Sequence, residues 1–368
     1  MTDIPAEPVW GIVAGLVIIA LMVLILPFKV KFIEHNLEVF FLTMGILSVT
    51  ISGVWGGQLV IDALKAPVII GSIPIGIFQV VLVVGIIIFF FHKQFSNAVI
   101  AMANRLSIGV FIFIMVTVMG LLSSVISVIL TSVLLAEVAA CLPLNRRDQI
   151  KLVVVTCYSI GLGAVLTPLG EPLSTILVQK LAGAPFYAGF TFPLTTFAKY
   201  VIPGVVGTAI FGAIWIGRKT AVCETTTAPE YSETQMNVIM RAVKVFAFVA
   251  ALVLLGEGLK PLIVWFLIRV SPAILFWTNM VSAILDNATL TAMEVSAGMM
   301  LSQITCIIMG LLIAGGMLIP GNIPNIVAAG KLKISMKEWA VIGIPIGLVM
   351  MSIYFIVLIP VIFQASSG

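Results

Sequence analysis

Long apolar runs constrain this chain more than any other feature. About 20 apolar residues are enough to cross the hydrocarbon core of a bilayer, and several stretches here reach that length. The apolar stretches lie near 9–27, 38–57, 72–91, 107–122, 125–143, 150–182, 195–217, 241–258, 272–300, 303–330 and 338–362. Lipid offers no hydrogen bonds to the backbone, and no alternating barrel pattern is present, so we expect an all-α polytopic membrane protein.

The composition supports this expectation. The chain is 61% hydrophobic and only 9% charged, whereas soluble domains carry about 25% charged residues. The four cysteines show no pairing or metal-ligand spacing. No phosphate-binding loop and no nucleic-acid-binding feature is evident, so we expect no nucleic-acid partner and no resident cofactor.

Two of the apolar stretches contain helix-breaking residues. The stretch 150–182 is interrupted at 167–172 (Thr-Pro-Leu-Gly-Glu-Pro), and the stretch 303–330 is interrupted at 320–325 (Pro-Gly-Asn-Ile-Pro-Asn). At membrane depth such interruptions are tolerated only where protein or water satisfies the freed backbone groups. They therefore predict two broken transmembrane helices, a feature typical of transporters.

Two further stretches, 107–143 and 272–300, are interpreted as re-entrant helical hairpins. Eight full crossings then remain, with both termini on one side. The lysines and arginines divide 14 against 5 between the two sides. The positive-inside tendency places the richer side in the cytoplasm, so we expect a multi-pass protein of the cytoplasmic (inner) membrane. If each hairpin were instead a double span, the loops would keep the same sides.

Short segments recur along the chain. Ser127–Ser132 (SVILTS) aligns with Ser282–Asn287 (SAILDN), and matches follow in the same order at an offset near 150–157. An odd number of crossings separates the copies, so the repeat would be inverted. The expected organisation is N-terminal scaffold helices at 1–71, repeat 1 at 72–218, a cytoplasmic linker at 219–240 and inverted repeat 2 at 241–362.

Asp286 and Asn287 form the most informative polar pair. A carboxylate inside an apolar run costs several kcal/mol and is usually functional. At a hairpin tip, carboxylate and amide oxygens can bind a hard cation such as sodium. The same carboxylate could bind a proton in place of the cation. The alternative is that Asp286 only caps a helix.

Other polar residues near the hairpin tips and the interruptions complete the candidate substrate- and cation-binding set. They are Ser127, Thr131, Ser132, Thr167, Glu171, Ser174, Ser282, Thr289, Asn322 and Asn325. The alternatives are hydroxyl bonding within a helix for the serines and threonines, and incidental polarity at a proline kink for the rest.

Three segments resemble the ion-transporter superfamily, which includes NhaD-type sodium/proton antiporters, ArsB-type arsenite permeases and sodium-coupled dicarboxylate carriers. The hairpin-tip sequence around Asp286-Asn287 is similar to that of the antiporter and arsenite branch. Residues 163–172 (GAVLTPLGEP) and 321–330 (GNIPNIVAAG) resemble its two broken-helix motifs. The overall layout is most similar to a compact, mainly prokaryotic group of cation transporters of undefined substrate, the DUF1646-like group.

The resemblance implies two inverted repeats, a scaffold with a moving transport domain, and often a homodimer. It departs at the first tip, where Thr131-Ser132 replaces an amide or acid, and at the second, where Ala288-Thr289 replaces a common proline. We expect a secondary transporter that exchanges sodium for protons, with sodium at Asp286, Asn287 and Asn322. The alternative is sodium-coupled symport of a small anion. An enzyme is not expected, because no nucleophile–base pair lies within the apolar runs, and a passive channel fits broken helices less well.

Overall fold

The protein is described by a computed structural model. The described residues are 5, 7–30, 32–33, 36–69, 78–79, 82–83, 86, 90, 94, 106–126, 128–142, 144–217, 235–285 and 287–364. The structure is 81% helical, and the described part of the chain contains no strand. Four described helices are long and apolar enough to cross a membrane: Ile108–Ile126, Phe192–Ile216, Ala242–Trp265 and Met336–Phe363. The prediction of an all-helical chain with helices able to cross a membrane is confirmed.

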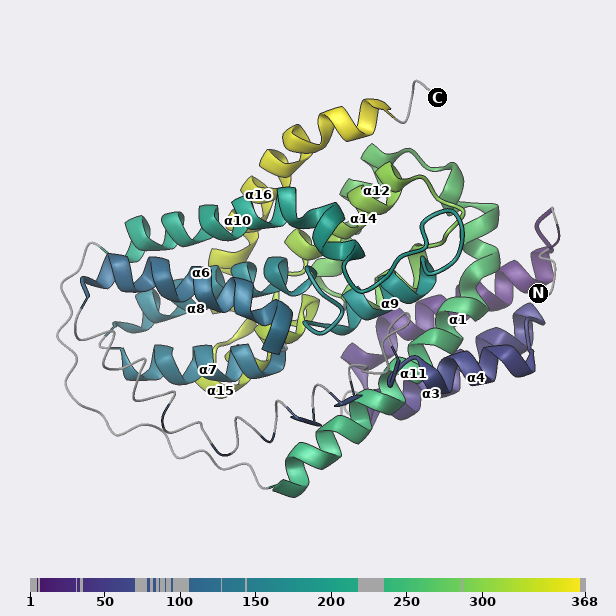
Figure 1. Cartoon of the computed structure of the whole chain (residues 1–368), viewed down its shortest axis with the longest axis horizontal. Helices are drawn as coiled ribbons and strands as arrows, with labels where there is room; N and C mark the ends of the chain where they lie inside the picture. Colours follow the sequence, from purple (N-terminus) through teal and green to yellow (C-terminus); the bar gives the residue numbers. More distant parts are fainter. Residues whose placement is uncertain are drawn as a thin grey trace.

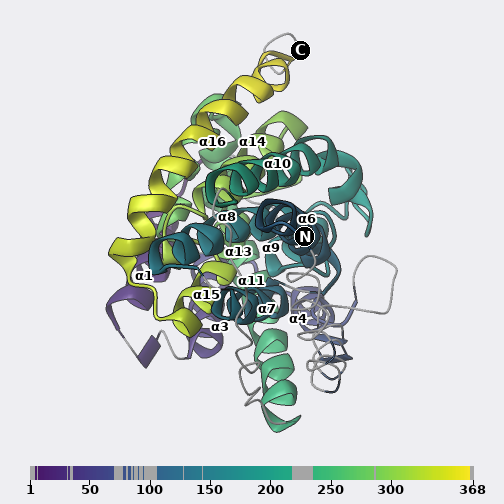
Figure 2. The same cartoon turned by 90° about the vertical axis from the view of Figure 1, so that its left-hand side faces the viewer.

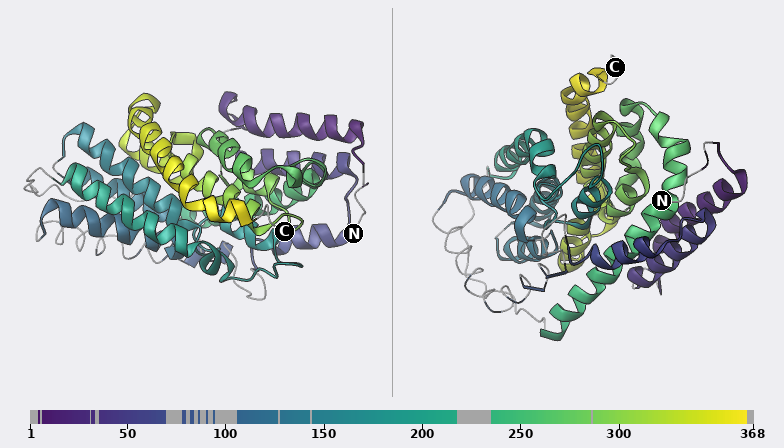
Figure 3. Two further views of the ribbon diagram at one scale, coloured as in Figure 1. Left: turned by 90° about the horizontal axis from the view of Figure 1, so that it is seen from above. Right: turned by 45° about the vertical axis from the view of Figure 1, so that its right-hand side comes forward.

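The N-terminal helices form a separate layer against the long helix α11 (Gln235–Trp265). This layer contains α1 (Trp10–Lys29), α3 (Leu37–Ser52) and α4 (Gly57–Lys65). Helix α3 packs along α11, α1 contacts both α3 and α11, and α4 contacts α11. Figures 1 and 3 show this group at one end of the molecule, beside the bundle that contains the interrupted helices.

The first interrupted unit runs from α6 to α10. Its elements are α6 (Ile108–Ile126), α7 (Val128–Cys141), α8 (Arg146–Ala164), α9 (Pro172–Lys180) and α10 (Phe192–Ile216). Helix α8 begins where the side chain of Asn145 accepts a hydrogen bond from the amide of Asp148, and α9 begins with a proline. Proline suits the first position of a helix because its missing N–H would have no intrahelical partner.

The second interrupted unit has the same order of elements. It contains α12 (Pro272–Thr278), the 3₁₀ turn η2 (Asn279–Ala283), α13 (Asn287–Glu294), α14 (Leu301–Ala314), η3 (Ile319–Gly321), α15 (Ile323–Leu332) and α16 (Met336–Gln364). Helices α8 and α14 are buried over most of their length. An all-apolar helix buried on every side is expected at the centre of a bundle. Helix α16 lies along an outer edge of the molecule (Figure 2).

The short helices pack across the two units. Helix α7 of the first unit packs against α15 of the second, and α13 of the second packs against α9 of the first. The central helices α8 and α14 also contact each other. Helices α7 and α13 are therefore each packed against the short helix that follows the other unit's interruption.

Some of the predicted segments contain residues that the structure does not describe. In others, the helices are shorter than a membrane span. Most of the predicted span 72–91 and most of the linker 219–240 lie outside the described residues. Within the first hairpin, α6 alone is long enough to span, whereas α7 is a 14-residue helix. In the second hairpin, α12 has 7 residues and α13 has 8.

Close backbone contact between α6 and α8 depends on a glycine pair. A Cβ added at Gly163 would overlap the carbonyl of Gly120, and backbone atoms cannot move aside as a flexible side chain can. We therefore expect Gly163→Ala to lower the stability of the detergent-purified protein by about 1–3 kcal/mol, the usual cost of overpacking.

Gly207→Ala is the matched control, because Gly207 is also inside a helix but a Cβ there meets nothing within 4 Å. The measurement is the thermal unfolding midpoint of both variants. Equal midpoints for the two variants would contradict the close packing of α6 on α8.

Candidate functional site

The first interruption is held by side-chain hydroxyls. Helix α8 ends at Ala164 and α9 begins at Pro172, so the intervening carbonyls lack intrahelical donors. Thr167 donates to the carbonyl of Ser124 in α6, Ser174 donates to that of Val165 at 2.9 Å, and Thr175 to that of Pro168 at 2.6 Å. These hydroxyls satisfy backbone groups that water would otherwise have to reach.

The first hairpin tip joins this interruption directly. The amide of Val128, the first residue of α7, donates to the carbonyl of Gly170 at 3.0 Å. On α6, the hydroxyl of Ser123 donates to the carbonyl of Ile160 in α8 at 2.9 Å. The N-termini of α7 and α9 therefore lie together, with the buried Glu171 at the N-cap of α9.

The second interruption is held by an asparagine. The Nδ2 atom of Asn325 donates to the carbonyls of Gly315 at 2.8 Å and Leu318 at 2.9 Å. Trp339 of α16 closes the same turn through a 3.1 Å hydrogen bond from Nε1 to the carbonyl of Gly316. One amide thus bridges the end of α14 and the start of α15.

The second hairpin tip meets this interruption at Asn287. The hydroxyl of Ser282 donates to Oδ1 of Asn287 and lies 3.3 Å from the carbonyl of Leu311. A Cβ added at Gly315 would lie 2.8 Å from both Nδ2 and Oδ1 of Asn287, so the absence of a side chain at Gly315 makes room for this amide. The N-termini of α13 and α15 therefore also lie together.

Asn322 connects the two junctions. Its side chain lies against α8, where a Cβ at Gly161 would be 2.6 Å from Nδ2 of Asn322. Gly161 lies one turn before the end of α8, and Asn322 is the N-cap of α15. Both interruptions and both hairpin tips thus meet in one region around the ends of α8 and α14.

Some buried polar atoms in this region have no hydrogen-bond partner among the described residues. They are Nδ2 of Asn287, Oδ1 of Asn325 and Oδ1 of Asn279. Each of these side chains is no more than 1% exposed. Because a buried polar atom without a partner costs about 1–3 kcal/mol, such atoms call for an explanation, and an unoccupied ligand position is one.

The predicted site residues divide into three groups. Ser282, Asn287, Asn322 and Asn325 come together around the second interruption, and Thr167, Glu171 and Ser174 lie around the first. Thr131, Ser132 and Thr289 are buried on α7 and α13, where Ser132 donates to the carbonyl of Val128 within its own helix. Asp286 and Ser127, the residues immediately before α13 and α7, lie outside the described residues.

Asn279 is a buried site residue that the sequence analysis missed. Its Nδ2 donates to the carbonyl of Leu275 at 2.8 Å and to the carboxylate of Glu294 at 3.0 Å. A single amide in an apolar run was the available signal, without the adjacent carboxylate that identified Asn287. The buried charged side chains of the described chain are all acidic: Glu137, Asp148 and Glu171.

The fold and these junctions define a helical protein with four described helices able to cross a membrane and two sites where a buried helix is interrupted. The chain belongs to the family described as "Protein of unknown function (DUF1646)", whose model matches residues 13–361. The predicted resemblance to the DUF1646-like group is confirmed by this match. A search of curated proteins finds no match.

The bridging role of Asn325 generates a stability prediction. Asn325→Ala leaves the carbonyls of Gly315 and Leu318 without their donor, so we expect a loss of about 2 kcal/mol or more in the free energy of unfolding. The measurement is unfolding of the purified protein in detergent.

Ser352→Ala is the control, because the hydroxyl of Ser352 bonds the carbonyl of Leu348 on an exposed helix face. That variant is expected to unfold as the wild type does. A similar small effect in both variants would show that Asn325 does not hold the second interruption.

Proposed function

We propose that this protein is a secondary active ion transporter of the cytoplasmic membrane that exchanges sodium for protons. The observation that carries the proposal is the buried amide oxygen Oδ1 of Asn325, which has no partner among the described residues and lies at a helix interruption close to Asn287, the residue that follows Asp286 in the sequence. Interrupted helices whose polar groups face a closed site near the midplane are the usual architecture of secondary transporters.

Features expected of an inverted repeat support this proposal. Corresponding residues lie 151 positions apart and perform similar tasks: Ser174 and Asn325 each bond a carbonyl at the end of the preceding helix. Ser123 and Ser282, which are 159 positions apart, lie by the carbonyls of Ile160 and Leu311, which are 151 positions apart. The reciprocal packing of α7 on α15 and α13 on α9 is what an approximate two-fold axis produces.

The directions of α10 and α16 support the inversion. The hydroxyl of Tyr354, near the end of α16, donates to the carbonyl of Tyr200, near the start of α10, at 2.8 Å. At the opposite end, Trp215 of α10 and Glu338 of α16 line one common pocket. The two helices, which occupy the last position in their units, therefore run antiparallel, as inverted copies must.

The electrostatics of the site favour cations and protons as cargo. The N-termini of α7, α9, α13 and α15 carry partial positive charge, and they meet two acidic positions, Glu171 and, by sequence, Asp286. No described lysine or arginine belongs to the buried set. Helix ends can therefore stabilise the ionised carboxylates in the interval between release of one cation and binding of the next.

The proposed mechanism uses one carboxylate for two cargoes. Sodium binds Asp286 with the amide oxygens of Asn287 and Asn322, and the oxygen of Asn325 supplies a further ligand. The hydroxyls of Thr167 and Ser174 donate to carbonyls, and Thr167 Oγ1 also accepts from the amide of Leu169 at 3.2 Å, so each oxygen keeps at least one lone pair as an acceptor. Because a proton and sodium compete for the same carboxylate, the loaded unit carries one or the other across the membrane.

Sodium-coupled symport of a small anion is the second candidate function. It is favoured by the buried donor Nδ2 of Asn287, which has no partner among the described residues, and by the helix N-termini, which bind anions well. In both functions the chain would belong to the ion-transporter superfamily, act without enzymatic chemistry, and work as a homodimer. Proton movement distinguishes the two.

Transport by Asp286→Asn is the decisive assay. In proteoliposomes loaded at acidic pH, external sodium is expected to trigger proton efflux through the wild type, and the variant is expected to lose this flux by at least about a hundredfold, because an amide cannot exchange a proton. A pH-sensitive dye inside the vesicles reports the flux.

Asp62→Asn is the matched control, since Asp62 is an exposed acid on α4 that accepts a 2.7 Å hydrogen bond from Gln58. Exchange that persists in Asp286→Asn would contradict the mechanism. Sodium-dependent uptake of an anion without any proton flux would instead establish the symporter.

Sodium binding can also be detected without transport. A ligand that binds only the folded state stabilises it, by about 2.7 kcal/mol at one hundred times its dissociation constant. We expect sodium, compared with choline, to raise the unfolding midpoint of the wild type and to have a much smaller effect on Asn287→Ala. Equal stabilisation of the two proteins would remove Asn287 from the cation site.

A further inference from the structure

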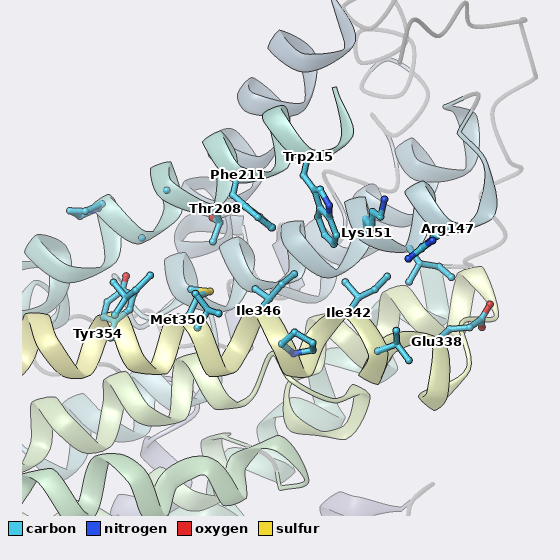
Figure 4. A pocket seen from close by; sticks show the side chains of 18 of the residues that line it. Arg147, Lys151, Thr208, Phe211, Trp215, Glu338, Ile342, Ile346, Met350 and Tyr354 are labelled. Atoms are coloured by element: carbon cyan, nitrogen blue, oxygen red, sulfur yellow. The ribbon is translucent and has the colours of Figure 1, made fainter. Parts of the chain in front are cut away.

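A large groove lies away from the proposed ion site, between α10 and α16. Its volume is about 1100 Å³, and α8 contributes residues at one end. Figure 4 shows side chains of both helices pointing into it, with Phe211 and Trp215 on one wall and Ile342, Ile346 and Met350 on the other. The hydrogen bond between Tyr354 and Tyr200 ties the two helices together at the far end.

The groove is long enough, measured along α16, to span the hydrocarbon layer. Its lining on α16 extends from Lys337 to Val357, which is about 30 Å at the 1.5 Å rise of a helix. The hydrocarbon core of a bilayer is about 30 Å thick. Between the two ends the α16 wall is mainly aliphatic, so its middle suits an acyl chain.

One end of the groove is basic. Arg146, Arg147, Lys151 and Lys337 line it, together with the acid Glu338. Arg146 is already paired with Glu338 at 3.2 Å, and Lys151 with Asp148 at 2.8 Å. Arg147 and Lys337 are exposed and have no carboxylate partner among the described residues.

Trp215 marks the same end. Its ring lies under the ammonium group of Lys151, with 4.7 Å from Nζ to the ring centroid. Tryptophan at the headgroup level and basic residues on the cytoplasmic side are the usual arrangement at a membrane surface. The basic end is thus the end that faces the leaflet rich in anionic lipids, given the positive-inside orientation.

We propose that this groove is a binding site for an anionic phospholipid, with the phosphate between Arg147 and Lys337 and an acyl chain along α10 and α16. Charge complementarity favours this occupant, because two cations without a carboxylate partner among the described residues lie at the basic end of an apolar groove. Basic pockets between transmembrane helices on the cytoplasmic side are known to bind phospholipid headgroups. The lipid would support the outer helices of the two units without touching the proposed ion site.

Tryptophan quenching tests the proposal. Phosphatidylglycerol or phosphatidylcholine with brominated acyl chains is titrated into the full-length protein in detergent micelles. The signal of Trp215 is the difference between wild type and Trp215→Phe. Two cations near the phosphate are expected to give phosphatidylglycerol a preference of about 30-fold.

Variants that change the basic end or the apolar wall of the groove make the test more specific. The double variant Arg147→Gln, Lys337→Gln is expected to lose the 30-fold preference, whereas Lys333→Gln, an exposed basic residue outside the groove, is expected to keep it. Gly207→Phe places a ring in the groove, because a Cβ at Gly207 meets nothing within 4 Å, and is expected to weaken quenching by both lipids.

Equal quenching of Trp215 by the two lipids in the wild type would overturn the proposal, as would an unchanged preference in the double variant. Protection of Trp215 from both lipids, increasing with protein concentration, would assign the groove to a second copy of the chain and also overturn it. None of these outcomes depends on sodium or proton transport, so the lipid site can fail while the exchange mechanism stands.

Discussion

The absence of hydrogen-bond partners in lipid is the constraint on which the rest of this structure depends. A helix interrupted inside a membrane frees carbonyls and amides that only protein can satisfy. In this chain hydroxyls do so at the first interruption, where Thr167 and Ser174 bond the carbonyls of Ser124 and Val165. At the second, the amide of Asn325 bonds two carbonyls at once. The starts of α7 and α13 lie beside the two interruptions because hydrogen bonds join these segments to each other.

The same polar shell explains why the centre of the protein suits an ion. The side chain of Asn325 uses its Nδ2 atom to hold the second interruption, and its Oδ1 atom is one of the buried atoms that the described residues leave without a partner. An unpartnered oxygen near the segment that contains Asp286 is the physical reason to propose competition between sodium and protons. The groove between α10 and α16 lies apart from this chemistry.

Much of the architecture could be predicted from the sequence, because apolar runs and helix breakers act locally. The helical membrane class followed from hydropathy, and prolines and glycines at 167–172 and 320–325 indicated where α9 and α15 begin. The length of α6, the helix α4 and the partners of each polar group depend on contacts between distant segments. Asn279 shows this limit, since its bond to Glu294 identifies it as part of a buried network only after folding. The groove could not be predicted from the sequence either, because Arg147 and Lys337, which line its basic end, are 190 residues apart. The roles of Asp286 and Ser127 stay predictions.

Proton release on sodium binding tests the central claim most directly. Sodium is titrated calorimetrically into the purified protein in two buffers that differ in heat of ionisation, so that the difference in heat counts the protons released. If sodium and a proton compete for one carboxylate at the second hairpin tip, about one proton leaves for each sodium bound near the pH at which that carboxylate is protonated. Sodium binding with identical heat in both buffers across the pH range would contradict the exchange mechanism.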